Sequence, residues 1–327
     1  MITFEVSQPM KKKSDKEHYS PYITISREEW AKRSDEAMLG LFEKDMQQLH
    51  AMNEPLTREE IAQIYVPLSR LLNLYVTAAQ QLHATTSKFL GNNNHKVPYI
   101  IGIAGSVAAG KSTTARVLQK LLSSWSDHSK VALVTTDGFL HPNRVLEERD
   151  LMNLKGFPES YDIKKLIRFL ADVKSGKEKI AAPLYSHLYY DVLTEEVQWI
   201  ESPDIVIVEG INVLQVRPGQ GKKEPAIFVS DFFDFSIYVH AAENDLKQWY
   251  IERFETLRQT AFRNPASYFH RFASLTKSES AEMAAKIWDE INRPNLEQNI
   301  LPTRFRASLI LDKGSHHFVQ SIMLRKT

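Results

Sequence analysis

A run of small residues followed by a lysine and two hydroxyl residues forms a phosphate-binding pattern. The stretch GSVAAGKS, residues 105–112, fits G-x-x-x-x-G-K-[ST]. Side chains this small let backbone N–H groups turn inward around phosphate oxygens, while Lys111 reaches the β- and γ-phosphates and the Ser112 hydroxyl ligates Mg²⁺. An apolar run before the loop and an amphipathic run after it predict a strand and a helix, whose N-terminus adds positive potential. We therefore predict a nucleotide-binding loop rather than an empty turn, formed by Gly105, Ser106, Val107, Ala108, Ala109, Gly110, Lys111, Ser112 and Thr113.

This loop alone does not distinguish a kinase from a switch GTPase or a motor. GTPases select guanine with Asn/Thr-Lys-x-Asp, and the nearest run here, residues 276–279, ends in glutamate. No predicted strand ends in Asp-x-x-Gly, because the run 205–208 is followed by Glu209 and Gly210. The pattern favours a small-molecule kinase that uses ATP.

Two acidic residues follow predicted strands where a phosphoryl acceptor would bind. Phosphoryl transfer to an alcohol needs a carboxylate near the acceptor oxygen and cations that hold the developing charge. Ligands of open α/β sheets bind beyond the carboxyl ends of the strands. There Asp137 closes the second predicted strand and Glu209 the third. We predict Asp137 as the general base, with a turn cap as the alternative. Glu209 is predicted to reach Mg²⁺ through water, with a salt-bridged strand end as the alternative.

A cluster of tyrosines with one histidine supplies a candidate acceptor site. The stretch APLYSHLYYDV brings together Tyr185, His187, Tyr189 and Tyr190. Hydroxyls and an imidazole with little net charge suit an uncharged or carboxylated acceptor rather than a phosphate. Packing in the core or on the surface is the alternative for such a cluster.

A later helical pattern places a cation among aromatic residues. Residues 245–262 are predicted to form a helix that carries Tyr250, Arg253, Phe254 and Leu257 on one face. Arg253 would bind an anionic group or the moving phosphoryl. Alternatively, its stem lies over core residues.

The candidate site residues described above must be positioned by a mainly parallel sheet with helices between its strands. Short runs of Ile, Val and Leu are typical of strands covered on both faces. We predict strands at 99–104, 131–135, 205–208, 235–239 and 307–311. Helical patterns follow Lys111, Ile163, Asn244 and Ser278, and this alternation favours a parallel α/β sheet with right-handed crossovers. Near the end of the chain, Asn292, Asn295 and Asn299 lie around Pro294 and Pro302 in a segment predicted to be irregular and polar.

The first part of the chain is predicted to be helical. SREE at 26–29 and TREE at 57–60 match the capping-box pattern, in which the glutamate reaches back to the cap. The second opens an amphipathic run over 61–76, which Pro67 should kink or restart. We expect one P-loop kinase domain over 1–327, with 1–95 as a helical extension and 96–327 as the nucleotide- and acceptor-binding core.

Composition narrows the class of protein. The chain has 327 residues, a net charge of +1 and no cysteine, which excludes disulfides, thiolate metal sites and a cysteine nucleophile. The charge balance gives no case for nucleic-acid or membrane-surface binding. Neither a signal peptide nor an apolar run of about eighteen residues is found, so we expect a cytoplasmic protein.

The chain resembles the prokaryotic type I pantothenate kinases from about residue 20 to its end. The stretches that carry the resemblance are YVPLSRLLN, PYIIGIAGSVAAGKSTTARVLQ, VTTDGFLHPN, KGFPESYD, APLYSHLYYDV, PDIVIVEGINVLQ, VSDFFDFSIYV, QWYIERF and NRPNLEQNILPTR. Together these stretches are far more specific than the nucleotide-binding loop, which many kinases share.

The resemblance implies ATP-dependent phosphorylation of the pantothenate hydroxyl to 4′-phosphopantothenate, the first step toward coenzyme A. By matching motif, Lys111 and Ser112 would serve the nucleotide phosphates and Mg²⁺, and Asp137 would act as the base. Arg253 would also face the transferred phosphoryl. The pantothenate site would be lined by Asp137, Tyr185, His187, Tyr190, Tyr250, Arg253 and Asn292.

Regulation and assembly follow from the same resemblance. It implies a homodimer that coenzyme A or its thioesters inhibit in competition with ATP, with Arg116, Lys111 and His187 as the regulatory residues. Asn53 and His317 would flank the adenine. The family often carries an aromatic residue where Leu257 stands, which affects the far end of the acceptor.

Two rival functions are weighed against this reading. A uridine- or phosphoribulose-type kinase shares the loop and the aspartate, but the segment with Tyr185, His187 and Tyr190 lacks the extra cations that a phosphorylated sugar needs. A nucleotide-binding regulator that hydrolyses slowly leaves a full acceptor pocket unexplained.

Overall fold

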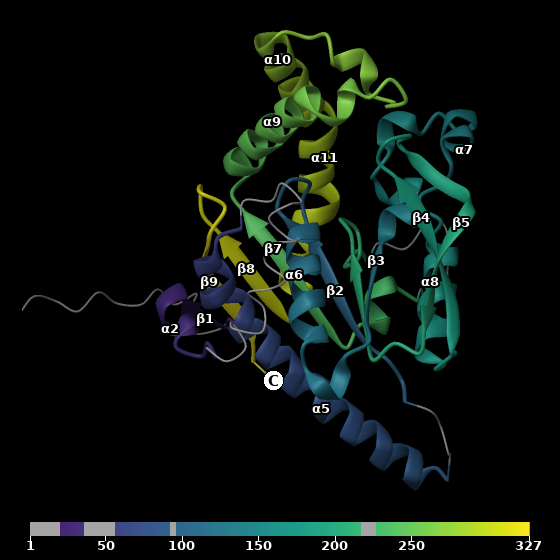
Figure 1. Cartoon of the computed structure of the whole chain (residues 1–327), viewed down its shortest axis with the longest axis vertical. Helices are drawn as coiled ribbons and strands as arrows, with labels where there is room; N and C mark the ends of the chain where they lie inside the picture. The colour runs from purple at the N-terminus through teal and green to yellow at the C-terminus, as the bar shows by residue number, and fades with distance from the viewer. Residues whose placement is uncertain (1–19, 36–55, 92–95, 217–226, 327) are drawn as a thin grey trace, which may run out of the picture.

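The computed structural model describes residues 20–35, 56–91, 96–216 and 227–326, and its centre is a seven-stranded sheet in the order β1-β9-β8-β7-β2-β6-β3 (Figure 1). The strands of this sheet are β1 (Tyr22–Ser26), β2 (Tyr99–Gly105), β3 (Val131–Thr135), β6 (Ile205–Glu209), β7 (Phe235–Ala241), β8 (Leu309–Lys313) and β9 (Val319–Arg325). Strands β3, β6, β2, β7 and β8 pair in parallel, whereas β9 and β1 are antiparallel at one edge. A separate antiparallel hairpin consists of β4 (Lys179–Ser186) and β5 (Asp191–Glu201).

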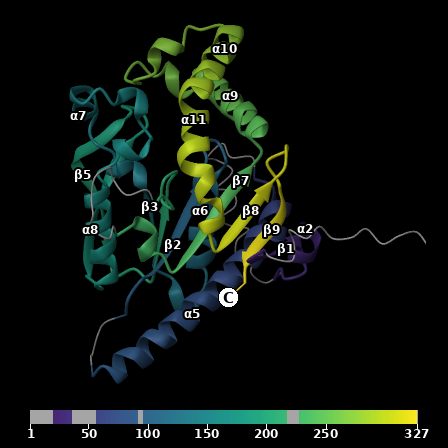
Figure 2. The ribbon, with the colours of Figure 1, turned by 180° about the vertical axis from the view of Figure 1, so that it is seen from behind.

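Helices cover this sheet and extend beyond the carboxyl ends of its parallel strands. They are α2 (Arg27–Ala31), α4 (Arg58–Glu60), α5 (Val66–Phe89), α6 (Lys111–Ser123), α7 (Asn143–Glu148), α8 (Ile163–Lys174), α9 (Glu243–Gln259), α10 (Lys277–Ile287) and α11 (Arg293–Asn295). In both views α9, α10 and α11 stand on one side of the strand ends, while the β4–β5 hairpin and α7 stand on the other (Figures 1 and 2).

The predicted α/β sheet is confirmed. Each of the five predicted strands is present, with ends within two residues of those expected. Strands β2 and β6 are buried along their whole length, as their unbroken apolar sequences indicate. The predicted helices begin at Lys111, Ile163, Glu243 and Lys277.

Strands β1, β4, β5 and β9 were not predicted. Tyr22 in β1 is the register partner of Arg325 in β9, so β1 depends on residues at the other end of the chain. The β4–β5 hairpin contains Pro183 and an irregularity in register between Pro183 and Leu184, which hides the strand pattern.

The N-terminal section packs on the same core as the sheet. The Ser26 and Thr57 hydroxyls accept hydrogen bonds from the backbone N–H groups of Glu29 and Glu60, so the hydroxyl half of each predicted capping box is confirmed. The Glu60 carboxylate does not reach back to its cap; it pairs with Arg27 and accepts from the Val319 N–H at 2.9 Å. That pairing ties the helices of this section to β9.

The helical pattern around Pro67 restarts, as predicted. Residues Ile61–Tyr65 form a π-helical turn, and α5 begins at Val66 with the proline in its first turn, where a missing N–H does no harm. The Tyr65 hydroxyl lies 3.1 Å from Thr114 Oγ1 of α6. Helix α5 is therefore fixed against the helix that follows the nucleotide-binding loop.

The prediction of an irregular segment around Pro294 and Pro302 is wrong. Residues 288–306 form successive helical turns: a π-helical turn Trp288–Asn292, α11, a second π-helical turn Leu296–Ile300 and the 3₁₀ turn Leu301–Arg306. Both prolines lie in the first turn of a new helical piece, where no intrahelical hydrogen bond is lost. Prolines therefore mark changes of helix type here rather than breaks.

Candidate active site

The nucleotide-binding loop has the predicted strand–turn–helix context. Strand β2 ends at Gly105, and α6 begins at Lys111 after Gly110, whose φ is +91°. Gly105 has a φ of +146°, and a Cβ there would lie 2.5 Å from the Val239 carbonyl oxygen, so only glycine fits. Ala108 also has a positive φ, of 63°. Such alternating backbone directions turn N–H groups toward one point and form an anion-binding concavity.

Lys111 lies within the electrostatic reach of the predicted acidic and basic site residues. Its Nζ donates to the Ser106 carbonyl at 2.9 Å. Burial lowers the pKa of Lys111, while Glu209 and Asp137 raise it and Arg253 lowers it. The fold thus brings the three predicted catalytic residues, Asp137, Lys111 and Arg253, together from separate elements.

A hydroxyl and a carboxylate meet at the start of α6. Ser112 Oγ donates to Glu209 Oε1 at 3.0 Å, and Glu209 at the end of β6 is 8% exposed. Oxygen donors of this kind are what Mg²⁺ prefers. Within the described ranges no three His, Cys, Asp or Glu side chains form a metal-binding group. This donor set therefore fits a metal that takes further ligands from phosphates and water, as Mg²⁺ does.

Asp137 lies one turn beyond the strand that it was predicted to close. Strand β3 ends at Thr135, and Asp137 occupies the 3₁₀ turn Thr136–Phe139. Its Oδ1 accepts a hydrogen bond from the Tyr161 hydroxyl at 3.4 Å. Burial, and then the nearby Asp137 charge, raise the pKa of Tyr161, which stays a donor to the carboxylate.

The turn that carries Asp137 is pressed against the hairpin that carries the tyrosine cluster. At Gly138 a Cβ would lie 2.3 Å from the Pro183 carbonyl oxygen of β4. Two residues further along β4, the Tyr185 ring lies 5.2 Å from the His187 ring and 6.3 Å from the Tyr190 ring. The turn of the candidate base is therefore in backbone contact with the strand that carries the predicted acceptor residue Tyr185.

Lys155 is a residue of this site that sequence reasoning missed. Its Nζ lies 3.8 Å from the centre of the Tyr190 ring and 5.2 Å from that of Tyr185. It also donates to Asn143 Oδ1 at 2.6 Å and to the Tyr190 carbonyl. Burial lowers the pKa of Lys155 to about 8, although Asp191 and Asp137 oppose the shift. No local pattern indicated this, because Lys155 reaches the tyrosines only through the fold.

Tyr250 and Asn292 come together from two helical segments. Burial raises the pKa of Tyr250, and a hydrogen bond with Asn292 lowers it. The Tyr250 ring also lies 5.8 Å from the Trp288 ring. Arg253, one turn along α9, is exposed, so its stem does not lie over the core as the alternative reading had it. Asn292 Nδ2 is buried, and it lies beside the Tyr250 hydroxyl.

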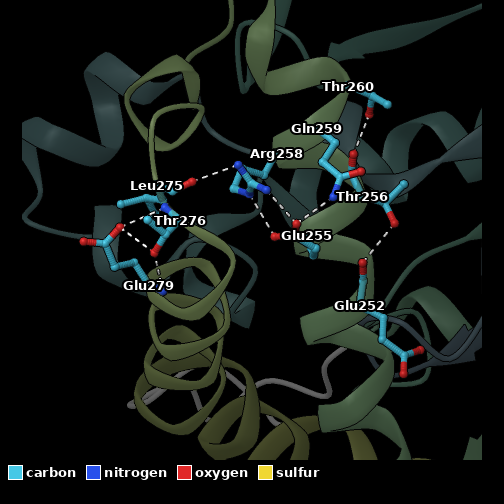
Figure 3. A network of polar contacts seen from close by, with 9 residues as sticks. All are labelled: Glu252, Glu255, Thr256, Arg258, Gln259, Thr260, Leu275, Thr276 and Glu279. Atoms are coloured by element: carbon cyan, nitrogen blue, oxygen red, sulfur yellow. Dashed lines mark hydrogen bonds and ion pairs between the residues drawn. The ribbon is translucent and has the colours of Figure 1, made fainter.

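A polar network fixes α9 against α10 and so fixes Tyr250 and Arg253 (Figure 3). Arg258 donates two hydrogen bonds to the Glu255 carboxylate, at 2.8 and 2.7 Å, and a third to the Leu275 carbonyl at 2.8 Å. Thr276 and Glu279 form the capping box of α10. The run at 276–279 thus starts a helix rather than selecting guanine.

On the outer side of the nucleotide-binding loop, His317 stacks on Trp249. Their ring centres are 3.9 Å apart and their planes differ by 22°. Lys313, 5.6 Å from the Trp249 ring, donates to the Ala109 carbonyl at 3.2 Å. His317 is therefore linked to the loop through Trp249 and Lys313, and its contact with adenine stays a prediction; Asn53 lies outside the described residues.

Arg116 lies one turn inside α6, near the same charges as Lys111. Burial lowers the pKa of Arg116, Glu209 raises it and Arg253 lowers it. Its role as a cation that meets the inhibitor's phosphates stays a prediction.

Among the described residues, no helix combines the length and apolar character that crossing a bilayer requires.

Comparison with known proteins agrees with this geometry. The model of the phosphoribulokinase/uridine kinase family matches residues 100–260. The chain is 58% identical over 311 residues to the pantothenate kinase of Brevibacillus brevis, a match that covers 94% of this chain and 97% of the relative. It is 53% identical to that of Serratia proteamaculans, with 96% and 99% covered.

A solved structure supports the fold. D-glycerate 3-kinase from Cryptococcus neoformans superimposes with a TM-score of 0.53 at 12% identity, covering 77% of this chain and 97% of that one. At this identity the likeness concerns the fold alone. Because the superposition covers 77% of this chain, it agrees with a P-loop α/β kinase fold over most of the chain.

Proposed function

The chain belongs to the type I pantothenate kinases, and from this premise we propose how its residues carry out the reaction. The protein is an ATP-dependent pantothenate kinase, which phosphorylates the pantothenate hydroxyl at the start of coenzyme A synthesis. The alternative is a uridine- or phosphoribulose-type kinase, which rests only on the match to the broader family model over residues 100–260.

Asp137 is the general base. The pantothenate hydroxyl gives its proton to the Asp137 carboxylate as its oxygen attacks the γ-phosphorus, and the bond to the β-phosphate oxygen breaks. Asp137 lies on a turn in contact with β4, the strand of the acceptor residue Tyr185, and this single observation carries the assignment. The Tyr161 hydroxyl orients the carboxylate through its hydrogen bond.

Lys111 and Arg253 compensate the charge of the transferred phosphoryl. Lys111 reaches the β- and γ-phosphates from the start of α6, beside the N–H groups of the loop 105–113. Arg253 approaches from α9, and its charge acts on Lys111. Two cations from opposite sides hold the developing negative charge in place.

The Ser112 hydroxyl would hold Mg²⁺, and Glu209 would act on the ion through water. The hydrogen bond between these two side chains, and the burial of Glu209, support a shared role. When bound, the ion neutralises charge on the β- and γ-phosphate oxygens.

Pantothenate lies between the β4–β5 hairpin and the α9–α11 segments. Tyr185, His187 and Tyr190 contact it from the hairpin side, together with Lys155. Tyr250 and Asn292 contact it from the helical side. The buried Asn292 Nδ2 beside the Tyr250 hydroxyl supports this, because buried polar groups are found where they have polar partners, and a polar ligand supplies further ones.

We also propose that coenzyme A inhibits the enzyme in competition with ATP. Its phosphates meet Arg116 and Lys111, and His187 contacts the same molecule. Adenine, of ATP or of the inhibitor, lies near His317 and Asn53. The active form is a cytoplasmic homodimer.

A coupled assay of ATP consumption tests this function. The wild-type enzyme is offered pantothenate, uridine and ribulose 5-phosphate separately, with the Lys111→Met variant as a control for contaminating kinases. Saturable turnover with pantothenate alone supports the proposal. Faster turnover with either other acceptor contradicts it.

A further inference from the structure

Buried side-chain amides connect three parts of the acceptor side of the fold. Asn295 Nδ2 donates to the Gly156 carbonyl at 3.0 Å, and Asn212 Nδ2 donates to the same oxygen at 2.8 Å. Behind Asn295, Asn299 Nδ2 donates to Asn295 Oδ1 at 2.9 Å, and Gln215 Nε2 donates to Asn299 Oδ1 at 3.3 Å. Asn212, Asn295 and Asn299 are between 4% and 8% exposed. Burying amides is favourable where their N–H groups find acceptors, and here Asn212 and Asn295 find the Gly156 carbonyl while Asn299 finds Asn295. Among the described residues, Asn212 Oδ1 has no hydrogen-bond partner.

The shared acceptor of these amides is the carbonyl next to Lys155. Gly156 has a φ of +97°, a conformation that favours glycine, and its N–H donates to Ser160 Oγ at 2.9 Å. Both polar groups of this peptide segment are therefore engaged. Lys155, whose Nζ lies over the Tyr190 ring, directly precedes this segment.

Each donor to this carbonyl is three residues from a residue of the proposed site. Asn212 follows Glu209, which ends β6 and pairs with Ser112. Asn295 follows Asn292 in the helical run that includes two π-helical turns. π-helical turns rotate the side chains that follow them, and they are frequent at functional sites.

We propose that Asn295 and Asn212 are positioning residues for pantothenate. Because both donate to one carbonyl, they fix the turn of Lys155 relative to Asn292. The distance between these two residues, which contact pantothenate from two sides, is then constant. This inference rests on the proposed function, which places Lys155 and Asn292 against pantothenate. Neither Asn295 nor Asn212 touches the reacting groups.

The chemistry of the network suits a fixed support. Amides do not titrate, so the hydrogen bonds of the network itself do not depend on pH. A carboxylate in place of Asn295 could not donate to the Gly156 oxygen and would repel it.

The first test compares steady-state constants for the wild type and Asn295→Ala. Losing one such hydrogen bond to a buried carbonyl weakens an equilibrium constant by about fivefold to tenfold. We expect the KM for pantothenate to rise by about that factor, while the KM for ATP changes less than about twofold. Asn212→Ala removes the other donor and should show the same split between the two substrates, which keeps the test valid if Asn295→Ala folds poorly.

Thr303→Val is the matched control. Thr303 is 4% exposed, and its hydroxyl donates to the Ile300 carbonyl at 2.7 Å in the same helical run, outside the amide network. The control should lower the melting temperature without raising the KM for pantothenate. Rescue of the KM by Asn295→Gln, which keeps the donor, would also support positioning.

A double-mutant cycle with Asn292→Ala separates this inference from the proposed function. If Asn295 acts through Asn292, the effect of Asn295→Ala on the KM for pantothenate shrinks in the Asn292→Ala background. An Asn292→Ala enzyme with a normal KM for pantothenate would overturn the proposed acceptor site itself. If Asn292→Ala raises that KM but Asn295→Ala and Asn212→Ala behave like Thr303→Val, the positioning inference alone is wrong.

Discussion

Gly138→Ala separates the candidate base from the acceptor strand by a calculable distance. The added Cβ would lie 2.3 Å from the Pro183 carbonyl oxygen and 2.9 Å from the carbonyl carbon. Both atoms belong to the backbone, so no side-chain rotation relieves the contact. Gly138 lacks a positive φ, and the perturbation is therefore steric rather than conformational.

The magnitude follows from that distance. Ordinary van der Waals contact begins near 3.4 Å, so the turn of Asp137 and the strand of Tyr185 must part by about 1 Å. A misplacement of about 1 Å between reacting groups costs about a hundredfold in rate. We therefore expect kcat with pantothenate to fall about a hundredfold. The affinity for ATP should be retained, because the three atoms nearest to the new Cβ belong to Pro183 and Leu184 of β4 and not to the loop 105–113.

The assay measures kcat by coupled ATP consumption and ATP affinity by equilibrium binding on the same preparation. Gly91→Ala is the control, since a Cβ at Gly91 meets nothing within 4 Å. It has a φ of +67°, so it should lose about 1 kcal/mol of stability and keep its kcat. A folded Gly138→Ala enzyme with normal kcat would refute the reasoning, as would an equal loss of ATP affinity.

Three further predictions concern single charged residues. Asp137→Asn should keep ATP binding while kcat falls by about a thousandfold, and near-normal turnover would remove Asp137 from the mechanism. Arg116→Ala should weaken inhibition by coenzyme A more than it raises the KM for ATP; equal weakening, measured as the inhibition constant against that KM, would argue against a regulatory role. Because burial lowers the pKa of Lys155 to about 8, its ammonium is lost as the pH rises, and the KM for pantothenate should increase above that pH. The folded protein releases this proton at a lower pH than the unfolded chain, so the same group makes the free energy of unfolding increase over that interval. Lys155→Met should raise the KM at low pH and abolish its pH dependence; an unchanged pH profile in this variant would assign the dependence to another group.

The nucleotide side of the site was predictable because its signals are local. The glycine positions, Lys111 and Ser112 lie within eight residues, and the strand and helix on either side have clear periodicity. Glu209 was predicted near the loop because parallel strands place their carboxyl ends together, and its hydrogen bond with Ser112 agrees with that expectation.

The acceptor side was only partly predictable because its contacts join segments that are distant in the sequence. Tyr185 and Tyr190 were noticed as a cluster, but Lys155, which reaches both rings, lies some thirty residues earlier in a turn without periodicity. The i, i+4 spacing of Asn295 and Asn299 agrees with a helix, yet Pro294 suggested irregular structure. Hydrogen bonds to Gly156 are tertiary, and no local pattern encodes them.

These two halves of the site differ in how they are supported. The residues predicted to serve ATP lie at the ends of β2 and β6 and at the start of α6, so the sheet that defines the fold also fixes them. The residues assigned to pantothenate lie on a separate hairpin and on α9 to α11, outside the sheet. A kinase with 12% identity shares the fold, so the fold is retained across very different sequences. Since the acceptor elements are held by contacts such as those of Gly138 and Gly156, changing those contacts should alter pantothenate recognition while ATP binding is kept.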